Sequence, residues 1–273
     1  MVTGIIRMNK YVSRLALWAC LSLLATLVVA NDRQVNNRAF QKGERFEFRA
    51  MYHSRFTGNV TAGDASLTIK PETVTVDGEP TMKIVGRANT NNFFSMFFKV
   101  ENEYVSWFPE KDLAPVRFHK NIREGRSRRN ADARFDSDKG LVHSRDTIIE
   151  SPAFVQDIIS AYYFARTFDM ESARPGDSFE VTFYHGGRVY VSRILFEGRE
   201  QLTTELGTFN TLRFKPEVLE GKVFSQPYPM TLWVSDDENK MPIRAESGLV
   251  VGRARLDLVQ FGGLKNMITS FVP

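Results

Sequence analysis

The residues best suited to acid–base or metal chemistry are four histidines, which lie far apart in the chain. None has a second histidine or a carboxylate at the spacing of a metal site on one element. The sequence also lacks the G-x-S-x-G, S-x-x-K and H-E-x-x-H motifs of nucleophilic and zinc-dependent enzymes. It therefore predicts no metal site, no cofactor and no catalytic residue. The histidines are His53, His119, His143 and His185.

Asp236 and Asp237 form a carboxylate pair directly after a predicted strand, residues 231–235. Two adjacent carboxylates could serve as acid and base or could bind calcium. Aspartate and asparagine also lead turns for backbone reasons, and Asn239 and Pro242 continue such a pattern. The composition favours a turn. His185 directly precedes two glycines, a pair typical of tight turns, and is therefore predicted to belong to a hairpin turn.

Four arginines lie within the seven residues 123–129. Such a cluster can hold a phosphate or an anionic lipid headgroup through paired hydrogen bonds, which makes Arg123, Arg126 and Arg128 candidate ligand-binding residues. If the segment is a strand, Arg126 and Arg128 share one face, and Arg123 and Arg129 share the other. The alternative is a solvated hairpin whose charge is neutralised by nearby acidic residues, namely Glu124, Asp132 and Asp136.

The most unusual local feature is the aromatic run 93–98, in a chain that contains 22 phenylalanines. If it is a strand, both of its faces are apolar. One face could line a cavity for an acyl chain, with a methionine adding adaptable packing. The alternative is a strand packed between the core and a helix. The candidate ligand-binding residues of this run are Phe93, Phe94, Met96 and Phe97.

Alternation of apolar and polar residues recurs along most of the chain and predicts half-buried antiparallel strands. One segment instead carries apolar residues at helical spacing, from Phe154 to Tyr163, and predicts a helix over about 152–168. Ser151 is its expected N-cap and Pro152 its first residue. The predicted fold is mainly β, an antiparallel curved sheet or partly open β-barrel with this one packed α-helix.

The predicted helix divides one β domain, residues 43–261, into a front half, 43–150, and a rear half, 177–261. A flexible lead-in over 31–42 and a C-terminal tail over 262–273 flank this domain. A domain of this size can bury a sufficient core without disulfides.

The first 30 residues resemble a secretory signal peptide. Arg7, Lys10 and Arg14 precede the apolar run 15–29, and cleavage is expected after Ala30. The run has about 15 residues, fewer than the roughly 20 that span a bilayer. Two alternatives are retention as a short anchor and lipidation at Cys20, the only cysteine.

Removal of the leader would change the apparent chemistry of the chain. Its three basic residues account for most of the formal charge of +4, and the remaining 33 Lys and Arg against 32 Asp and Glu leave +1. A nearly neutral chain gives no electrostatic case for a nucleic-acid partner. A chain without cysteine also excludes thiol catalysis and zinc–thiolate sites.

Three sequence blocks resemble the bacterial family called domain of unknown function 3108 (DUF3108). The first runs from Gly43 to Ala65, the second from Asp157 to Arg166 with Pro175–Asp177, and the third from Leu232 to Asp237 with Pro242–Arg244. The resemblance implies export, a Gram-negative envelope and a β-rich, barrel-like domain. It implies no activity and supplies no site residues.

The leading hypothesis is an exported periplasmic protein without enzymatic activity that binds a lipophilic or envelope component. The protein is expected to contact a membrane only through its leader, where the leader is not cleaved. One alternative is a structural module that docks on an outer-membrane or cell-wall protein. The other is a hydrolase of envelope glycans or lipids that uses Asp236, Asp237 or His185.

Overall fold

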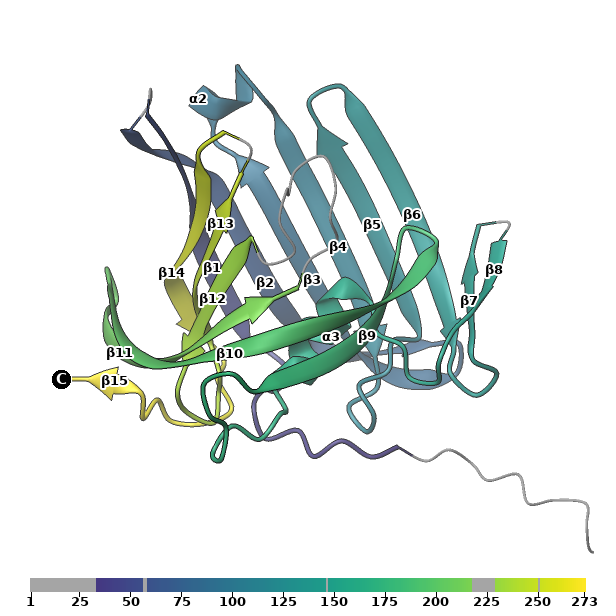
Figure 1. Ribbon diagram of the computed structural model, residues 1–273. Coiled ribbons are helices and arrows are strands. Elements are labelled where there is room, and N and C mark those ends of the chain that lie inside the picture. Colours follow the sequence, from purple (N-terminus) through teal and green to yellow (C-terminus); the bar gives the residue numbers. More distant parts are fainter. Residues whose placement is uncertain (1–32, 56–57, 146, 218–228, 250) are drawn as a thin grey trace, which may run out of the picture. The chain divides into compact units, whose positions relative to one another are not determined.

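The computed structural model describes residues 33–273 except 56–57, 146, 218–228 and 250. The chain divides into two units, 1–32 and 33–273, and the predicted leader lies outside the described residues. The second unit is built on a single antiparallel sheet (Figure 1). Its strands are β1 (Arg45–Ser54), β2 (Gly58–Val76), β3 (Glu79–Thr90), β4 (Val100–Phe108), β5 (Arg117–Glu124), β6 (Ser127–Asp136), β7 (Leu141–Ser144), β8 (Thr147–Glu150), β9 (Ser178–His185), β10 (Arg188–Thr204), β11 (Gly207–Pro216), β12 (Met230–Ser235), β13 (Pro242–Gly248), β14 (Arg253–Gly262) and β15 (Phe271–Val272).

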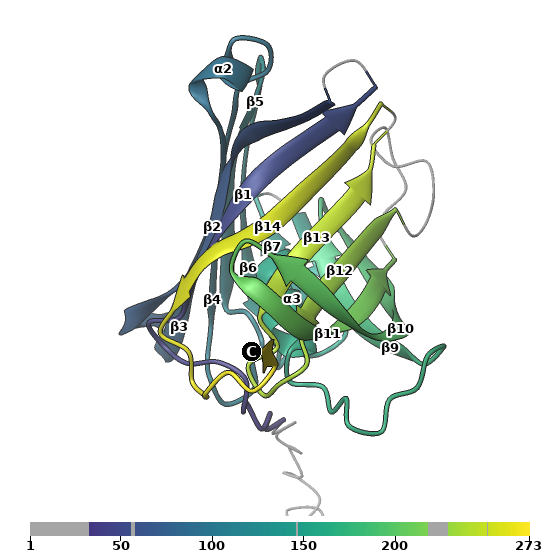
Figure 2. The same ribbon diagram turned by 90° about the vertical axis from the view of Figure 1, so that its left-hand side faces the viewer.

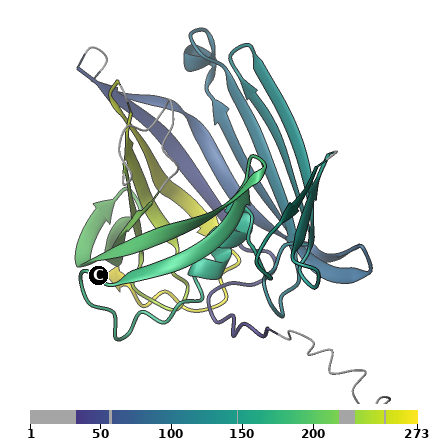
Figure 3. The ribbon, with the colours of Figure 1, turned by 45° about the vertical axis from the view of Figure 1, so that its right-hand side comes forward.

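The sheet runs in the order β8-β7-β6-β5-β4-β3-β2-β1-β14-β13-β12-β11-β10-β9, and β15 pairs with β11. It curves so that its two ends form facing walls with a helix between them (Figures 2 and 3). In the described part of the chain, the end strands β8 and β9 do not pair with each other. The sheet is therefore a partly open barrel, which confirms the predicted fold class.

Bulges and a glycine assist the curvature of the sheet. The β1 register shifts between Glu47 and Phe48 against β14, and that of β10 shifts between Phe196 and Gly198 against β11. Such irregularities bend a strand and increase its twist. At Gly63 a β-carbon would overlap the backbone of Asn89 on β3, so only glycine permits this approach of β2 and β3.

The packed helix, α3 (Ile158–Ala165), begins later than the predicted start at 152. Two features keep the preceding residues out of the helix. Phe154 has a positive φ of 58°, and Gln156 forms a parallel bridge with Phe183 of β9. The N-cap is Asp157 rather than Ser151, and it forms a capping box with Ser160.

The aromatic run is not a strand, which corrects a second prediction. Residues Asn92–Ser95 form a short helix, α2, in the connection between β3 and β4. Asn91 caps it, because its side-chain oxygen accepts a hydrogen bond of 2.8 Å from the backbone N–H of Phe94. The same side chain donates to the Thr61 carbonyl at 2.6 Å, which fixes the helix to β2.

The core begins in the segment that was expected to be a flexible lead-in. Ala39 and Phe40 are buried in one cluster with Phe108 and Tyr163. Asn37 folds this segment by accepting hydrogen bonds from the backbone of Ala39 and Phe40. The predicted tail is also held, since β15 pairs with β11. Burial of apolar side chains outweighs the polar composition that suggested mobility.

We predict that Asp157 makes stability depend on pH. Burial raises the pKa of this carboxyl from 3.8 to about 6, even though it accepts hydrogen bonds from Ser106 and from two backbone N–H groups of α3. A folded-state pKa above the unfolded value gives stability that is complete below pH 3.8 and is lost as the pH rises through 6. The expected loss is about 3 kcal/mol.

Urea unfolding between pH 4 and pH 7 measures this effect. The control is Asp157→Asn, because asparagine caps helices equally well but does not titrate. The free energy of unfolding of the variant should not show the loss attributed to Asp157. As the pH rises, the free energy of unfolding of the wild type should therefore fall relative to that of the variant. Parallel curves for the two proteins would contradict the assignment.

Candidate functional site

An apolar cavity of about 520 Å³ lies between α3 and the wall formed by β9, β10, β11 and β12. Most of its lining is aliphatic or aromatic. From α3 and the segment that follows it come Ile158, Ala161, Tyr162, Ala165, Phe168 and Met170. From the wall come Phe179, Val181, Phe183, Ile194, Phe214, Pro216, Met230, Leu232 and Val234.

The wall side of the cavity follows from strand alternation. Alternate residues of β9, from Phe179 to Phe183, face the cavity, and on β12 the series from Met230 to Val234 does the same. Register continues this face across the wall, because Phe214 of β11 is paired with Leu232 of β12. Each strand thus contributes one apolar face to the same hollow.

The helix side of the cavity depends on two different faces of α3. Tyr163 is fully buried against Phe40 and Phe108, with ring centroids 4.7 and 6.0 Å apart. The other face carries Ala161 and Ala165, whose short side chains do not reach the facing wall. The helix is therefore anchored on one side and leaves space on the other.

The polar side chains in the cavity lining belong to Tyr162, Arg166, His185, Ser192, Glu217 and Lys240. His185 stands at the end of β9, and burial, together with the positive charges of Lys120 and Arg129, lowers its pKa. Burial also lowers the pKa of Lys240. The hydroxyl of Tyr162 is buried and has no hydrogen-bond partner among the described residues. His185 and Lys240 could form hydrogen bonds with a ligand that has one polar end.

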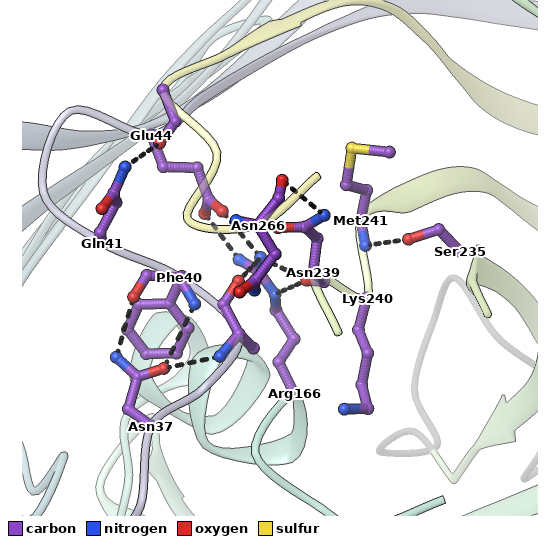
Figure 4. Close-up of polar contacts among 12 residues, drawn as sticks. Asn37, Phe40, Gln41, Glu44, Arg166, Ser235, Asn239, Lys240, Met241 and Asn266 are labelled. Atoms are coloured by element: carbon purple, nitrogen blue, oxygen red, sulfur yellow. Dashed lines mark hydrogen bonds and ion pairs between the residues drawn. The ribbon is translucent and has the colours of Figure 1, made fainter. Parts of the chain in front are cut away.

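A buried ion pair fixes α3 in place, and we call it the Arg166 centre: Arg166, Glu44 and the carbonyls of Ala39 and Asn239 (Figure 4). The guanidinium donates to both Glu44 carboxylate oxygens, at 2.6 and 2.8 Å. It also donates to the Asn239 carbonyl at 2.7 Å. Burial opposes the charge of Arg166, but the adjacent Tyr162 and Glu44 side chains hold its pKa above the ordinary value.

Aromatic rings enclose the Arg166 centre. The guanidinium carbon lies 5.2 Å from the ring centroids of Phe40 and Tyr163 and 5.4 Å from that of Phe46. Cation–π attraction at such distances adds to the hydrogen bonds when the charge is desolvated. Sequence reasoning missed this pair, whose members are 122 residues apart. No local pattern indicates an ion pair across that separation.

The candidate residues of the aromatic run do not line the apolar cavity. Phe93 contacts both Phe94 and Phe97, and Phe94 also contacts Tyr52 of β1. Phe93, Met96 and Phe97 are strongly exposed. The alternative of a strand packed into the core is therefore wrong.

The candidate arginines lie on the β5–β6 hairpin and are also outside the cavity lining. Arg123 of β5 and Arg128 of β6 are directly paired and therefore share one face of the sheet. The prediction that Arg123 shares a face with Arg129 is wrong. Arg126 lies in the turn. The alternative prediction, a solvated hairpin whose charge is neutralised by acidic neighbours, is correct in part. Glu124 forms an ion pair with Arg129 at 2.7 Å.

The residues suggested for a hydrolase form other contacts or lie in different hollows. Asp237 accepts hydrogen bonds from Ser235, Ser270 and the backbone of Asn239, as expected for a turn. Asp236 forms an ion pair with Arg199 at 3.1 Å. Both aspartates line a polar hollow that is distinct from the apolar cavity with His185. The structure therefore separates His185 from the two aspartates, and both aspartates are engaged in other contacts.

Among the described residues, no group of three or more His, Cys, Asp or Glu converges in a way that could hold a metal ion. In the same residues, no helix is long and apolar enough to cross a membrane.

The fold and cavity define a curved, partly open antiparallel sheet that encloses a helix and an apolar hollow. The chain belongs to the family of proteins of unknown function DUF3108, whose profile matches residues 47–259. This confirms the resemblance seen in the sequence. No curated protein matches the chain in sequence.

Several solved structures are similar in fold. A β-barrel-like protein of the domain of unknown function DUF1849 from Brucella abortus shares 8% identity, with a TM-score of 0.49, covering 82% of this chain and 98% of that one. A protein of Parabacteroides distasonis, provisionally assigned as a lipoprotein, shares 10% identity, with a TM-score of 0.35 and coverage of 85% and 100%. An exported protein of Bacteroides fragilis with a YmcC-like fold, also provisionally assigned, shares 11% identity, with a TM-score of 0.34 and coverage of 84% and 99%.

We predict that Glu44→Gln lowers the free energy of unfolding by about 3–5 kcal/mol, because it leaves a buried guanidinium without its carboxylate. Denaturant unfolding measures the change. Glu44→Leu combined with Arg166→Met removes both charges and should cost less than Glu44→Gln alone.

The matched control is an exposed ion pair, Arg117 with Asp132, joined at 3.0 Å. Asp132→Asn should cost less than about 1 kcal/mol because solvent screens this pair. Equal costs for Glu44→Gln and Asp132→Asn would show that the Arg166 centre is not a main support of the fold.

Proposed function

We propose that this protein is an exported envelope protein that binds a lipophilic ligand in the cavity between α3 and β9–β12. The observation that carries the proposal is the cavity itself, about 520 Å³ with an apolar lining. Ligand sites in proteins have volumes of about 300–1,000 Å³ and mostly apolar walls with a few placed polar groups. The leader-like segment of residues 1–30 supports export.

The chemistry of the lining favours an amphipathic ligand. The aliphatic and aromatic part of its lining offers dispersion and hydrophobic contacts, which suit an acyl chain. His185 and Lys240 are groups that could bind a polar end. A fatty acid or a phospholipid has both parts. An empty apolar hollow also costs stability, and a bound ligand would restore that stability.

We predict that Ala161→Trp abolishes ligand binding by filling the cavity from the helix side. The probe is dansyl-labelled undecanoic acid, whose fluorescence increases in an apolar site. Its affinity should fall at least about tenfold in the variant. The matched control is Val191→Trp, because Val191 is exposed on β10 and neighbours the cavity residue Ser192 on the opposite face.

Thermal unfolding of each variant shows whether it remains folded. Solvent extraction of the protein after export, followed by mass spectrometry, should recover a lipid from the wild type and from Val191→Trp but not from Ala161→Trp. Equal probe affinity in all three folded proteins would refute binding in this cavity.

A further inference from the structure

The aromatic run and the arginine run, separate in sequence, form one surface at an end of the sheet. Figure 1 places α2 and the β5–β6 turn at this end, with α3 toward the other. The backbone N–H of Gly125 donates to the Lys99 carbonyl at 2.8 Å. The Phe98 ring lies against Gly125, where a β-carbon would be 3.1 Å from it. We call residues 93–101 and 123–129 the aromatic–arginine rim.

The rim exposes large apolar side chains to solvent. Phe93 is 59% exposed, Met96 73% and Phe97 74%. Soluble surfaces seldom present such side chains together unless they bind something. The exposure does not come from a loose loop, because Asn91 caps α2 and Thr90 and Ser95 join their hydroxyls at 3.0 Å.

The rim is also strongly cationic. It contains five Lys and Arg and two Glu, a net charge of +3, in a chain whose other parts are nearly balanced. Lys99 and Arg123 lie beside Glu101, and Arg129 pairs with Glu124. Arg126 and Arg128 are exposed and form no ion pair with any described residue. Two cations thus remain free for an external anion.

A row of apolar residues on one face of the sheet connects the rim with the cavity. Phe94 contacts Tyr52, which shares a face of β1 with Ala50. Ala50 is paired with Leu256, Leu256 with Ala245, and Ala245 with Leu232. Directly paired residues lie on the same face, and Leu232 lines the cavity. From Tyr52 to Leu232, every residue of this row is half-buried.

We propose that the aromatic–arginine rim docks the protein on the surface of an anionic phospholipid bilayer. Phenylalanine side chains on a surface element can bury at the boundary between headgroups and acyl chains, and arginines beside them attract anionic headgroups. The inference rests on the proposed function for the ligand, since the apolar row would guide a lipid from the bilayer to the cavity. It assigns the membrane a direct contact with the folded domain rather than with the leader alone.

Vesicle flotation tests the docking. The chain used begins at Asn31, since residues 33–273 form a unit of their own. The vesicles hold equal phosphatidylglycerol and phosphatidylcholine, at an ionic strength of about 0.05 M. The protein should float with them, should bind far less to pure phosphatidylcholine, and should be released at about 0.5 M salt. Equal binding to both vesicle types would contradict the charge-based part of the proposal.

Two paired variants locate the contact. Arg126→Gln with Arg128→Gln should weaken binding about 30-fold, the effect of two basic residues at an anionic surface. Phe93→Ser with Phe97→Ser should weaken it at least about tenfold. The matched controls are Arg45→Gln with Arg174→Gln, and Met267→Ser with Ile148→Ser, which change exposed residues outside the rim. These controls should bind as the wild type does.

The result separates docking from ligand binding. Rim variants should bind dansyl-labelled undecanoic acid normally, whereas Ala161→Trp should lose the probe and keep vesicle binding. Rim variants that float as well as the wild type would overturn the docking proposal. So would a rim-dependent dimer seen by sedimentation without vesicles, because a second copy of the chain would then be the occupant.

Discussion

The buried ion pair between Arg166 and Glu44 is the interaction on which the arrangement of the domain depends. It connects the end of α3 with the start of β1 and with the turn between β12 and β13. Asn239 extends the connection to Asn266 near the C-terminus. In the described chain, the end strands of the sheet do not close the barrel by pairing. The helix, held by this pair, therefore sets how the inside of the curved sheet is filled.

Holding the helix in this way has a consequence for packing. Large rings, Tyr163 and Phe108 among them, fill the space between α3 and β3–β4. Toward β9–β12 the helix presents Ala161 and Ala165 beside the larger Ile158 and Tyr162, and the hollow remains. A buried charge is expensive unless it is paired and hydrogen-bonded, and here the guanidinium donates to both Glu44 carboxylate oxygens and to the carbonyls of Ala39 and Asn239. The packing of α3 against β3–β4 therefore offsets the stability that the hollow costs.

Much of the fold follows from local patterns, and the failures have specific physical causes. Alternation identified strands where one face is more buried than the other, as in β1 and β3. The helix start was misplaced because Phe154 adopts a left-handed conformation and Gln156 pairs with β9, which no spacing rule shows. The aromatic run was misread because its apolar composition suggested burial, whereas the Asn91 cap turns it into a helix at the end of the sheet. The cavity residues carry an ordinary strand pattern, and only the register across the wall shows which of them face one hollow.

The central claim is that this hollow is a lipid site rather than a packing defect. The most direct measurement is a crystal structure of the protein purified after export, without detergent or added lipid. We expect continuous, elongated electron density between Ala161 on α3 and Leu232 on β12, with its polar end near His185 or Lys240. Direct packing of α3 against the wall, or a hollow that contains only ordered water, would contradict it.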